Sequence, residues 1–353
     1  MRIIILVDNL HNGGAGRVAS VLANCLCENH EVHVVAKESG IKYPIKNSVG
    51  FHAFDVNFRF AKTEVLFRLI HYIRLIRKIC PDIIISLGYV SKYTAFAKAF
   101  IGKPRFKTID SERSDPNQVP SANFMRWLRD YLYGKSDLLV CQTYQAEQYF
   151  RRRIKVKTVV IPNPITPNLP YWNGMNSHDI VAPCRLDEQK NIPMLIDAFE
   201  RIHGIYPRYR LLIYGKGPLE HKLKELIMRK HLGNCVELRG FTTNLHDILS
   251  KSFMFVSSSD HEGLSNSMLE ALAIGIPVVC TDCPIGGASM FINDKENGML
   301  TPVKDTRRFF EAMRFLIEHK EVLPAMFGHA VKIRQSLDAE TIAGLWMKTI
   351  DGL

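Results

Sequence analysis

The segment from Asp260 to Asp282 reads DHEGLSNSMLEALAIGIPVVCTD and holds two glutamates, Glu262 and Glu270, with seven residues between them. Ser265 is predicted to cap a short helix over Asn266 to Ile274, which a glycine and a proline bring to an end. Glu262 then lies on the turn before the helix, and Glu270 lies about one helical turn inside it. Carboxylates in such positions are candidates for ligand binding.

The start of this helix could hold a phosphate, because unpaired amides and the helix dipole attract anions. The amides concerned belong to Leu264, Ser265, Asn266 and Ser267. A carboxylate repels phosphate but accepts two hydrogen bonds from vicinal hydroxyls. Phosphates with a diol nearby describe a nucleotide sugar. The alternative is that Glu270 is a solvated helix residue and Glu262 a capping group, and spacing alone does not separate the two.

The elements around this segment alternate short apolar runs with amphipathic stretches, which predicts βαβ units and parallel sheets. A Pro-, Asn- and Gly-rich stretch, ITPNLPYWNGMNSHD, interrupts the series. We therefore predict an α/β fold with two doubly wound Rossmann-like domains facing across a cleft and a helical C-terminus from Thr306 onward. The domains are expected at residues 1–165 and 179–353, with a linker at 166–178. Ligands should collect at the carboxyl ends of the strands.

Composition limits the remaining possibilities. The 353 residues are 46% hydrophobic and carry a formal net charge of +11, which indicates an anionic partner: nucleic acid, an acidic membrane surface or a phosphorylated substrate. No apolar run reaches the roughly 18 residues that span a bilayer, and the first residues do not resemble a signal peptide, so a cytoplasmic location is expected. The eight cysteines lack zinc spacing and are interpreted as structural, and no metal-ligand cluster or cofactor motif is found.

A basic amphipathic helix is predicted over Lys62 to Ile79. Its expected apolar stripe comprises Leu66, Leu69, Ile70, Ile73 and Ile76, with Arg68, Arg74, Arg77 and Lys78 mostly elsewhere. Such a helix can lie on an anionic bilayer, and FMRWLRDYLYGK and YFRRRIKVK add aromatic and cationic residues. The alternative is that the stripe only packs on the sheet, as in any crossover helix.

The stretch EGLSNSMLEALAIGIPVV resembles the E-x7-E motif of retaining glycosyltransferase family 4, whose members have the two-domain GT-B fold. The resemblance extends over essentially the whole chain. It implies that Glu270 binds the donor ribose and Glu262 contacts the transferred sugar. It also places the backbone amides of Ser265 to Ser267 at the donor diphosphate.

Other segments resemble the same family. VAPCRLDEQKN is similar to its Arg–Lys pair, which places Arg185 and Lys190 at the donor pyrophosphate, where negative charge builds as the glycosidic bond breaks. IYGKGP is similar to its G-x-G-P turn, in which Gly215 and Gly217 let the backbone approach the nucleotide. Phe241, in LRGF, lies where relatives hold the base, although an aromatic residue there could simply be core.

The N-terminal loop NGGAGR follows a strand and opens a helix, so it suits anion binding. It lacks the dinucleotide fingerprint, because Ala19 stands where the third glycine is needed, and this disfavours NAD. The resemblance implies that Gly13 and Gly14 lie near the donor phosphates and that Arg17 points toward an acceptor or a phosphate.

The chain departs from many family members after the strand FKTIDSERSDP. Ser111, Glu112 and Arg113 stand where those members carry a histidine, and the pattern S-E-R-x-D-P resembles a subset that builds bacterial surface polysaccharides. Ser111 and Arg113 are expected near the acceptor or a phosphate. Glu112 is expected to contact the acceptor or the sugar, because ligand groups lie on loops at strand ends, or else to pair with Arg113 and order the loop.

The resemblance implies a retaining, metal-independent hexosyltransferase that moves a sugar from a nucleoside diphosphate, expected to be uridine diphosphate (UDP), to a lipid-linked or glycan acceptor by front-face substitution. It also implies a peripheral position on the inner face of the cell membrane. A nucleotide-sugar epimerase of similar architecture is a second hypothesis, and the basic helix speaks against it. A basic nucleic-acid-binding protein is a third, but no recognisable module supports it.

Overall fold

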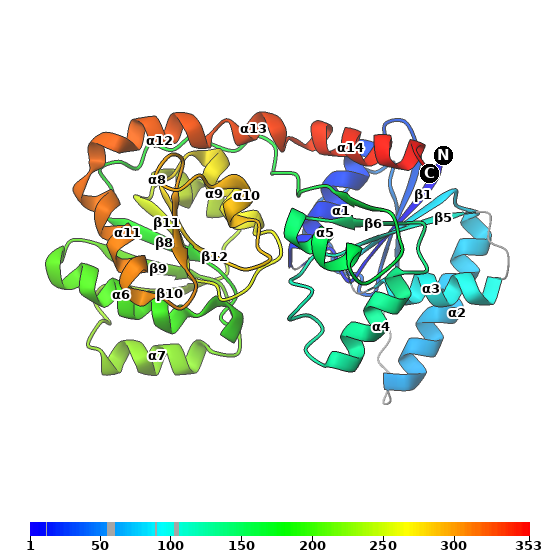
Figure 1. The fold of residues 1–353 in the computed structure, drawn as a ribbon, viewed down its shortest axis with the longest axis horizontal. Coiled ribbons are helices and arrows are strands. Elements are labelled where there is room, and N and C mark those ends of the chain that lie inside the picture. Colours follow the sequence, from blue (N-terminus) through cyan, green and yellow to red (C-terminus); the bar gives the residue numbers. More distant parts are fainter. Residues whose placement is uncertain (12, 55–60, 89, 102–105) are drawn as a thin grey trace. The chain divides into compact units, whose positions relative to one another are not determined.

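A computed structural model describes residues 1–11, 13–54, 61–88, 90–101 and 106–353 of the chain (Figure 1). The chain forms two compact units. Unit 1 comprises Met1–Pro164 together with Leu337–Leu353, and unit 2 comprises Ile165–Ser336. Each unit has its own parallel sheet, as the alternating pattern predicted.

Unit 1 is built on a seven-stranded parallel sheet in the order β3-β2-β1-β4-β5-β6-β7. Several of its strands, such as RIIILV of β1 and IIISL of β4, are near-continuous apolar runs, as is typical of a parallel sheet covered by helices on both faces. Their bounds are β1 Arg2–Val7, β2 Glu31–Ala36, β3 Gly50–Ala53, β4 Ile83–Leu87, β5 Lys107–Ser111, β6 Leu138–Cys141 and β7 Thr158–Val160. The helices are α1 Gly13–Leu26, α2 Ala61–Ile79, α3 Ser91–Ile101, α4 Asn123–Tyr133, α5 Tyr144–Arg151 and α14 Ala339–Asp351.

Unit 2 is built on a six-stranded parallel sheet in the order β10-β9-β8-β11-β12-β13. The strands are β8 Asp179–Pro183, β9 Arg210–Tyr214, β10 Val236–Gly240, β11 Met254–Ser257, β12 Val278–Asp282 and β13 Met299–Pro302. The α-helices are α6 Ile192–Ile205, α7 Glu220–Arg229, α8 Leu245–Lys251, α9 Asn266–Ile274, α10 Ala288–Phe291, α11 Thr306–Glu318, α12 Leu323–Ala330 and α13 Ile333–Ser336. Two 3-10 turns, η1 Glu188–Lys190 and η2 Lys320–Val322, complete it.

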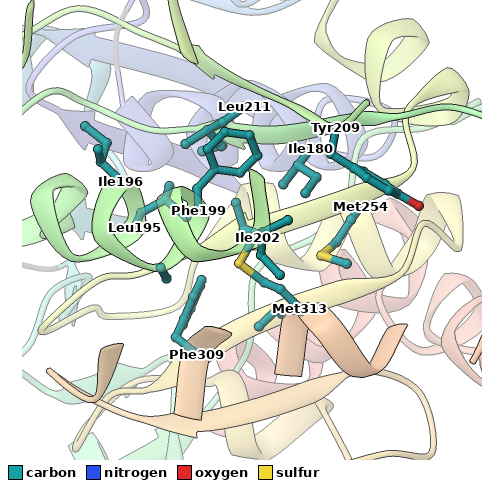
Figure 2. Packing of buried hydrophobic residues seen from close by; sticks show 14 of the residues in the cluster. Ile180, Leu195, Ile196, Phe199, Ile202, Tyr209, Leu211, Met254, Phe309 and Met313 are labelled. Atoms are coloured by element: carbon teal, nitrogen blue, oxygen red, sulfur yellow. The ribbon is translucent and has the colours of Figure 1, made fainter. Parts of the chain in front are cut away.

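The core of unit 2 holds the loops of the site in place. Phe199 and Ile202 of α6 pack with Phe309 and Met313 of α11 and with Met254 of β11, and all five side chains are buried (Figure 2). Packing of this density leaves little freedom to the strands, so the loops at their carboxyl ends start from fixed positions. The order of the strands reverses between β8 and β11, which is the switch point where open α/β sheets bind ligands.

The division of the chain differs from the expected one near the C-terminus. Residues 166–178 belong to unit 2, and the last segment, expected in the second domain, belongs to unit 1. The reason is α14, which packs on α1 and buries Ile342, Trp346 and Ile350. The C-terminal region is mostly helical, as predicted. The strands β3 and β13 and the helices α8 and α10 had not been predicted. The sequences GFHA of β3 and MLTP of β13 contain no run of three apolar residues. Helices α8 and α10 are too short for a helical period to stand out.

Helix α2 turns a different face to the sheet from the one predicted. Leu69 and Ile76 are buried as expected, but Tyr72 and Ile79 complete the buried stripe. Leu66 and Ile70, predicted in that stripe, are 57% and 41% exposed. The buried set follows the helical spacing of three and four residues more closely than the predicted set does. Ile73, also predicted in that stripe, is partly buried and packs against the core, so of the predicted set only Leu66 and Ile70 are surface residues.

Candidate active site

The E-x7-E segment folds as its residue types dictate. Helix α9 begins at Asn266, and the Ser265 hydroxyl accepts a hydrogen bond from the Met268 amide at 3.4 Å. The helix stops at Gly275, whose φ of 85° is left-handed and which donates to the carbonyls of Ala271 and Leu272. The predicted cap and end are therefore confirmed. The first turn of α9 follows β11, at the carboxyl edge of the sheet.

Glu270 is a buried carboxylate and not a solvated helix residue. Its side chain is 2% exposed. One oxygen, Oε1, accepts from Thr166 Oγ1 at 2.7 Å, and Oε2 lies 3.0 Å from His246 Nε2 in α8. A buried carboxylate is stable only when it is hydrogen-bonded, and two partners from distant segments fix its orientation. Neither partner could be predicted from the sequence, because neither lies at a local spacing from Glu270.

Glu262 forms an ion pair with Lys190, the last residue of η1, and both side chains are about 15% exposed. Ser259 Oγ also donates to Glu262 Oε1 at 2.7 Å, and Gln189 Nε2 donates to Oε2 at 3.2 Å. Burial would lower the pKa of Lys190, but the charge and hydrogen bond of Glu262 outweigh it and hold the pKa above its ordinary value. Lys190 is therefore a fixed cation at physiological pH.

The pair joins the two loops that meet at the switch point. Lys190 follows β8 and Glu262 follows β11, and these two strands are neighbours in the sheet. The Ser258 hydroxyl donates to the carbonyl oxygen of Lys190 at 2.8 Å, and Gln189 Nε2 donates to that of His261 at 2.8 Å. These contacts hold the cation and the carboxylate in one rigid group.

Arg185 is placed differently from Lys190, although both follow β8. Its side chain is 69% exposed and pairs with Asp187 at 3.1 Å. Its guanidinium also donates to Gln189 Oε1 at 3.1 Å. Gln189 also contacts Glu262 through its amide nitrogen, so Gln189 links Arg185 to the Lys190–Glu262 pair.

Two glycines after β9 allow the backbone to pass close to this loop. A Cβ on Gly215, whose φ is 148°, would lie 1.8 Å from the Cys184 carbonyl oxygen, and one on Gly217 would lie 2.3 Å from that of Leu186. The two segments are joined by backbone hydrogen bonds, including Leu186 N to Lys216 O at 3.1 Å. Gly215 and Gly217 therefore allow the segment after β9 to pack closely on the backbone that carries Arg185. The sequence pattern did not reveal this packing role of the two glycines.

Phe241 directly follows β10 and is 58% exposed. The alternative that it is a core residue is wrong. An exposed aromatic ring beside the carboxyl edge of the sheet offers a flat surface on which a planar group can stack.

In unit 1, the glycine loop opens α1 directly after β1. Gly13 has a φ of 77° and is exposed, as is Gly14, while Arg17 is partly buried. A Cβ on Gly16 would lie 2.3 Å from the Asn9 carbonyl oxygen, so the start of α1 packs tightly on the end of β1. Asn12 of the NGGAGR motif lies outside the described residues.

The residues after β5 form a buried polar group. Ser111 is fully buried, and Glu112 is 5% exposed. Glu112 Oε1 accepts from the amides of Arg113 at 2.8 Å and Ser114 at 2.9 Å, and Oε2 lies 3.5 Å from Arg129. These contacts match the loop-ordering role that was one expectation for Glu112. The guanidinium beside its carboxylate belongs to Arg129, and not to Arg113 as expected. Its contact with a substrate stays a prediction.

Arg113 is held on both sides within unit 1. Its Nη1 donates to Asn163 Oδ1 at 2.7 Å, and its guanidinium lies 5.9 Å from the centre of the Trp346 ring in α14. Burial lowers the pKa of Arg113 to about 10, so it keeps its charge at neutral pH. The burial of Ser111 differs from the expectation that it contacts an acceptor, because no surface of its hydroxyl is accessible in this structure.

Asp110 gives unit 1 a pH-dependent stability. Burial raises the pKa of this carboxyl to about 7, against the lowering effect of hydrogen bonds from Ser136 and Ser86. Between pH 4 and 7 the folded protein therefore binds a proton that the unfolded chain releases. The free energy of unfolding should fall as pH rises across this window, by up to about 1.4 kcal/mol per pH unit.

Asp110→Asn removes the titration while keeping the shape of the side chain. Urea unfolding at pH 5 and pH 7.5, followed by fluorescence, should show the wild-type protein losing more stability than the variant. Parallel losses in the two proteins would contradict the assignment.

Among the residues that the structure describes, no cluster of three or more His, Cys, Asp or Glu side chains is arranged to hold a metal ion. No described helix is both long and apolar enough to cross a bilayer.

Two doubly wound units, each with candidate ligand groups at the carboxyl ends of its strands, are the architecture expected of the GT-B fold. Two family models match the chain: "Glycosyltransferase Family 4" over residues 12–169 and "Glycosyl transferases group 1" over residues 177–319. The chain belongs to the family 4 type of GT-B glycosyltransferases and is a hexosyltransferase.

Similar proteins have been described in bacteria. The amylovoran biosynthesis glycosyltransferase AmsD of Erwinia amylovora is 26% identical over 91% of both chains. A Campylobacter jejuni protein named N-acetylgalactosamine-N,N'-diacetylbacillosaminyl-diphospho-undecaprenol 4-alpha-N-acetylgalactosaminyltransferase is 26% identical over 96% of both chains.

Solved structures share the fold. Sucrose-phosphate synthase from Thermosynechococcus elongatus superposes with a TM-score of 0.85 at 17% identity, and Anabaena HepE in complex with UDP and glucose with a TM-score of 0.83 at 20% identity. Each comparison covers 100% of both chains.

Proposed function

We propose that this enzyme transfers a hexosyl or N-acetylhexosaminyl group from a UDP-sugar to a lipid-linked or glycan acceptor in the assembly of a bacterial surface polysaccharide, with retention of anomeric configuration. The observation that carries the proposal is the arrangement around α9. A capped helix start lies between two fixed carboxylates, Glu262 and Glu270, with the cation Lys190 bound to the first.

This arrangement suits a sugar nucleotide part by part. The helix start offers amides to a diphosphate, and Glu270 offers a buried carboxylate to a ribose diol. Phe241 offers a ring for the base. Glu262 offers acceptor oxygens to the hydroxyls of the transferred sugar. The named relatives support the choice of donor and acceptor: HepE was solved with UDP and glucose, and the Campylobacter enzyme's name specifies a diphospho-undecaprenol acceptor.

The proposed mechanism is front-face substitution without a metal ion. The acceptor hydroxyl attacks the anomeric carbon on the side from which the diphosphate leaves, and the leaving phosphate oxygen takes the acceptor proton. Lys190, Arg185 and the amides of Ser265 to Ser267 stabilise the charge that builds on the diphosphate. In unit 1, Gly13 and Gly14 are proposed to approach the donor phosphates, and Arg17 and Arg113 to serve the acceptor or a phosphate.

The proposed place of action is the cytoplasmic face of the cell membrane, with peripheral contact. The support comes from the chemistry of the acceptor, because a sugar nucleotide is water-soluble and a diphospho-undecaprenol acceptor lies in a bilayer. Neither the epimerase nor the nucleic-acid-binding hypothesis is favoured, because the named relatives are glycosyltransferases.

The stereochemistry and the donor can be tested together. The enzyme is incubated with a lipid-linked acceptor and a panel of α-linked nucleotide sugars that includes uridine, guanosine and thymidine diphosphate donors. The product linkage is determined by proton NMR. An α-linked product is expected. A β-linked product would contradict retention, and transfer only from a guanosine or thymidine nucleotide would contradict the UDP donor.

His246 is predicted to position Glu270 for the donor. His246→Ala removes the partner of Glu270 Oε2 and should weaken UDP binding about tenfold, while turnover at saturating donor changes little. His246→Gln, whose amide can reach the same oxygen, should restore most of the affinity. Calorimetric titration with UDP measures the effect, and His221→Ala, a change of an exposed histidine in α7, is the control. Equal affinities in all four proteins would contradict the role.

A further inference from the structure

Helices α2, α3 and α4 are neighbours in unit 1 (Figure 1). Each of them exposes large apolar side chains. Helix α3 contacts both of the others. We name the exposed apolar set the α2–α4 face: Val65, Leu66, Ile70, Phe96, Phe100, Phe124, Trp127 and Tyr131. A folded protein seldom leaves so many large apolar residues on adjacent helices unless they bind a partner.

Helix α4 carries the most pronounced part of this face. Phe124, Trp127 and Tyr131 follow one another at a spacing of three and four residues and are 66%, 60% and 52% exposed. The opposite side of the helix is buried through Leu132 and Tyr133. The exposed rings stack in sequence, with centroids 5.8 Å and 5.9 Å apart. The helix therefore has a buried inner side, which also carries Arg129, and an aromatic outer side.

Cations lie directly beside these rings. A groove of about 570 Å³ is lined by Trp127 and Tyr131 and by four basic residues: Arg126, Lys135, Arg153 and Lys155. Asp130 is the one acidic residue among those described that line it, and it is already paired with Arg129 at 2.7 Å. Lys135 lies 5.0 Å from the centre of the Tyr131 ring. The groove is therefore positively charged.

We infer that the α2–α4 face and this groove bind the surface of an anionic lipid bilayer. Trp and Tyr rings favour the boundary between headgroups and acyl chains, and basic side chains are attracted to anionic headgroups. A free phosphate would need the cations but not the exposed aliphatic side chains of α2 or Phe100. The sequence had placed the contact mainly on the helix over Lys62 to Ile79, whereas the stacked rings place its centre on α4.

This inference deepens the proposed action on a lipid-linked acceptor, and its test needs neither donor nor acceptor. The full-length enzyme is sedimented with vesicles of pure phosphatidylcholine or of phosphatidylcholine with phosphatidylglycerol, at low and high salt. The variants are Trp127→Ser with Tyr131→Ser, and Lys155→Glu. Met228→Ser is the matched control, because Met228 is an equally exposed apolar residue on α7 of unit 2.

Wild type and Met228→Ser are expected to bind the anionic vesicles, with loss of binding at high salt. Both test variants should bind the anionic vesicles at least about tenfold more weakly than wild type does. Transfer to a short-chain, water-soluble acceptor should be unchanged in the test variants, which separates this inference from the proposed function. No binding of wild type to anionic vesicles, or equal binding by all four proteins, would overturn the inference.

Discussion

Replacing Lys190 by alanine is expected to lower the turnover of sugar transfer by about 10²- to 10³-fold, the usual effect of removing one fixed group that stabilises charge in a transition state. The cation is held in place by Glu262, which is held in turn by Ser259 and Gln189, so no reorganisation is needed when charge builds on the diphosphate. Alanine also leaves Glu262 without its cation, and the free energy of unfolding should fall.

The loss of stability has to be separated from the loss of rate. Thermal unfolding shows how much of each variant is folded at the assay temperature, and single-turnover kinetics with saturating donor then give the chemical step. Lys304→Ala is the matched control, because Lys304 is 72% exposed and lies 3.8 Å from Asp260 in the same unit. It should leave turnover nearly unchanged. A Lys190→Ala enzyme with full single-turnover rate would show that Lys190 only supports the fold.

Gly215→Ala is expected to inactivate the enzyme through its backbone. The new Cβ would lie 1.8 Å from the Cys184 carbonyl oxygen, and the φ of 148° is one that alanine avoids. The chain can accommodate it only by moving the strand end that carries Arg185. We expect a loss of about 3 kcal/mol or more in the free energy of unfolding and a fall in turnover beyond what the unfolded fraction explains.

A second glycine provides the control for this substitution. Gly204 lies inside α6, and a Cβ there would meet nothing within 4 Å. Gly204→Ala should be neutral or stabilise by up to about 1 kcal/mol, because alanine favours a helix. Urea unfolding and turnover of both variants make the comparison. A Gly215→Ala enzyme as stable and active as Gly204→Ala would contradict the close packing seen here.

Periodicity predicted the elements that depend on local pattern. The long apolar strands and α9, with its serine cap and glycine end, are where the sequence placed them, because caps, turns and buried strands are encoded by adjacent residues. The strands β3 and β13 were missed because GFHA and MLTP contain no run of three apolar residues. The last helix was assigned to the wrong unit, because chain order does not reveal that α14 packs on α1.

The site shows the same division between local and distant information. Glu262 and Glu270 could be found from their spacing, and the motifs pointed to Lys190 and Arg185. The partners that orient them could not be found, since Thr166 and His246 lie 104 and 24 residues from Glu270. Glu112 was expected either to contact a substrate or to order its loop. The sequence could not separate the two, because a strand-end carboxylate looks the same whether it faces solvent or also accepts from two loop amides, as it does here.

The most direct test of the proposed transfer is the release of UDP from UDP-sugars by wild type and by Glu270→Ala, with and without a lipid extract of the source cells. Release that depends on the extract and is abolished in Glu270→Ala, while thermal unfolding shows the variant folded, is the predicted result. No release from any UDP-sugar, together with no protection of the wild-type enzyme from unfolding by UDP, would contradict it.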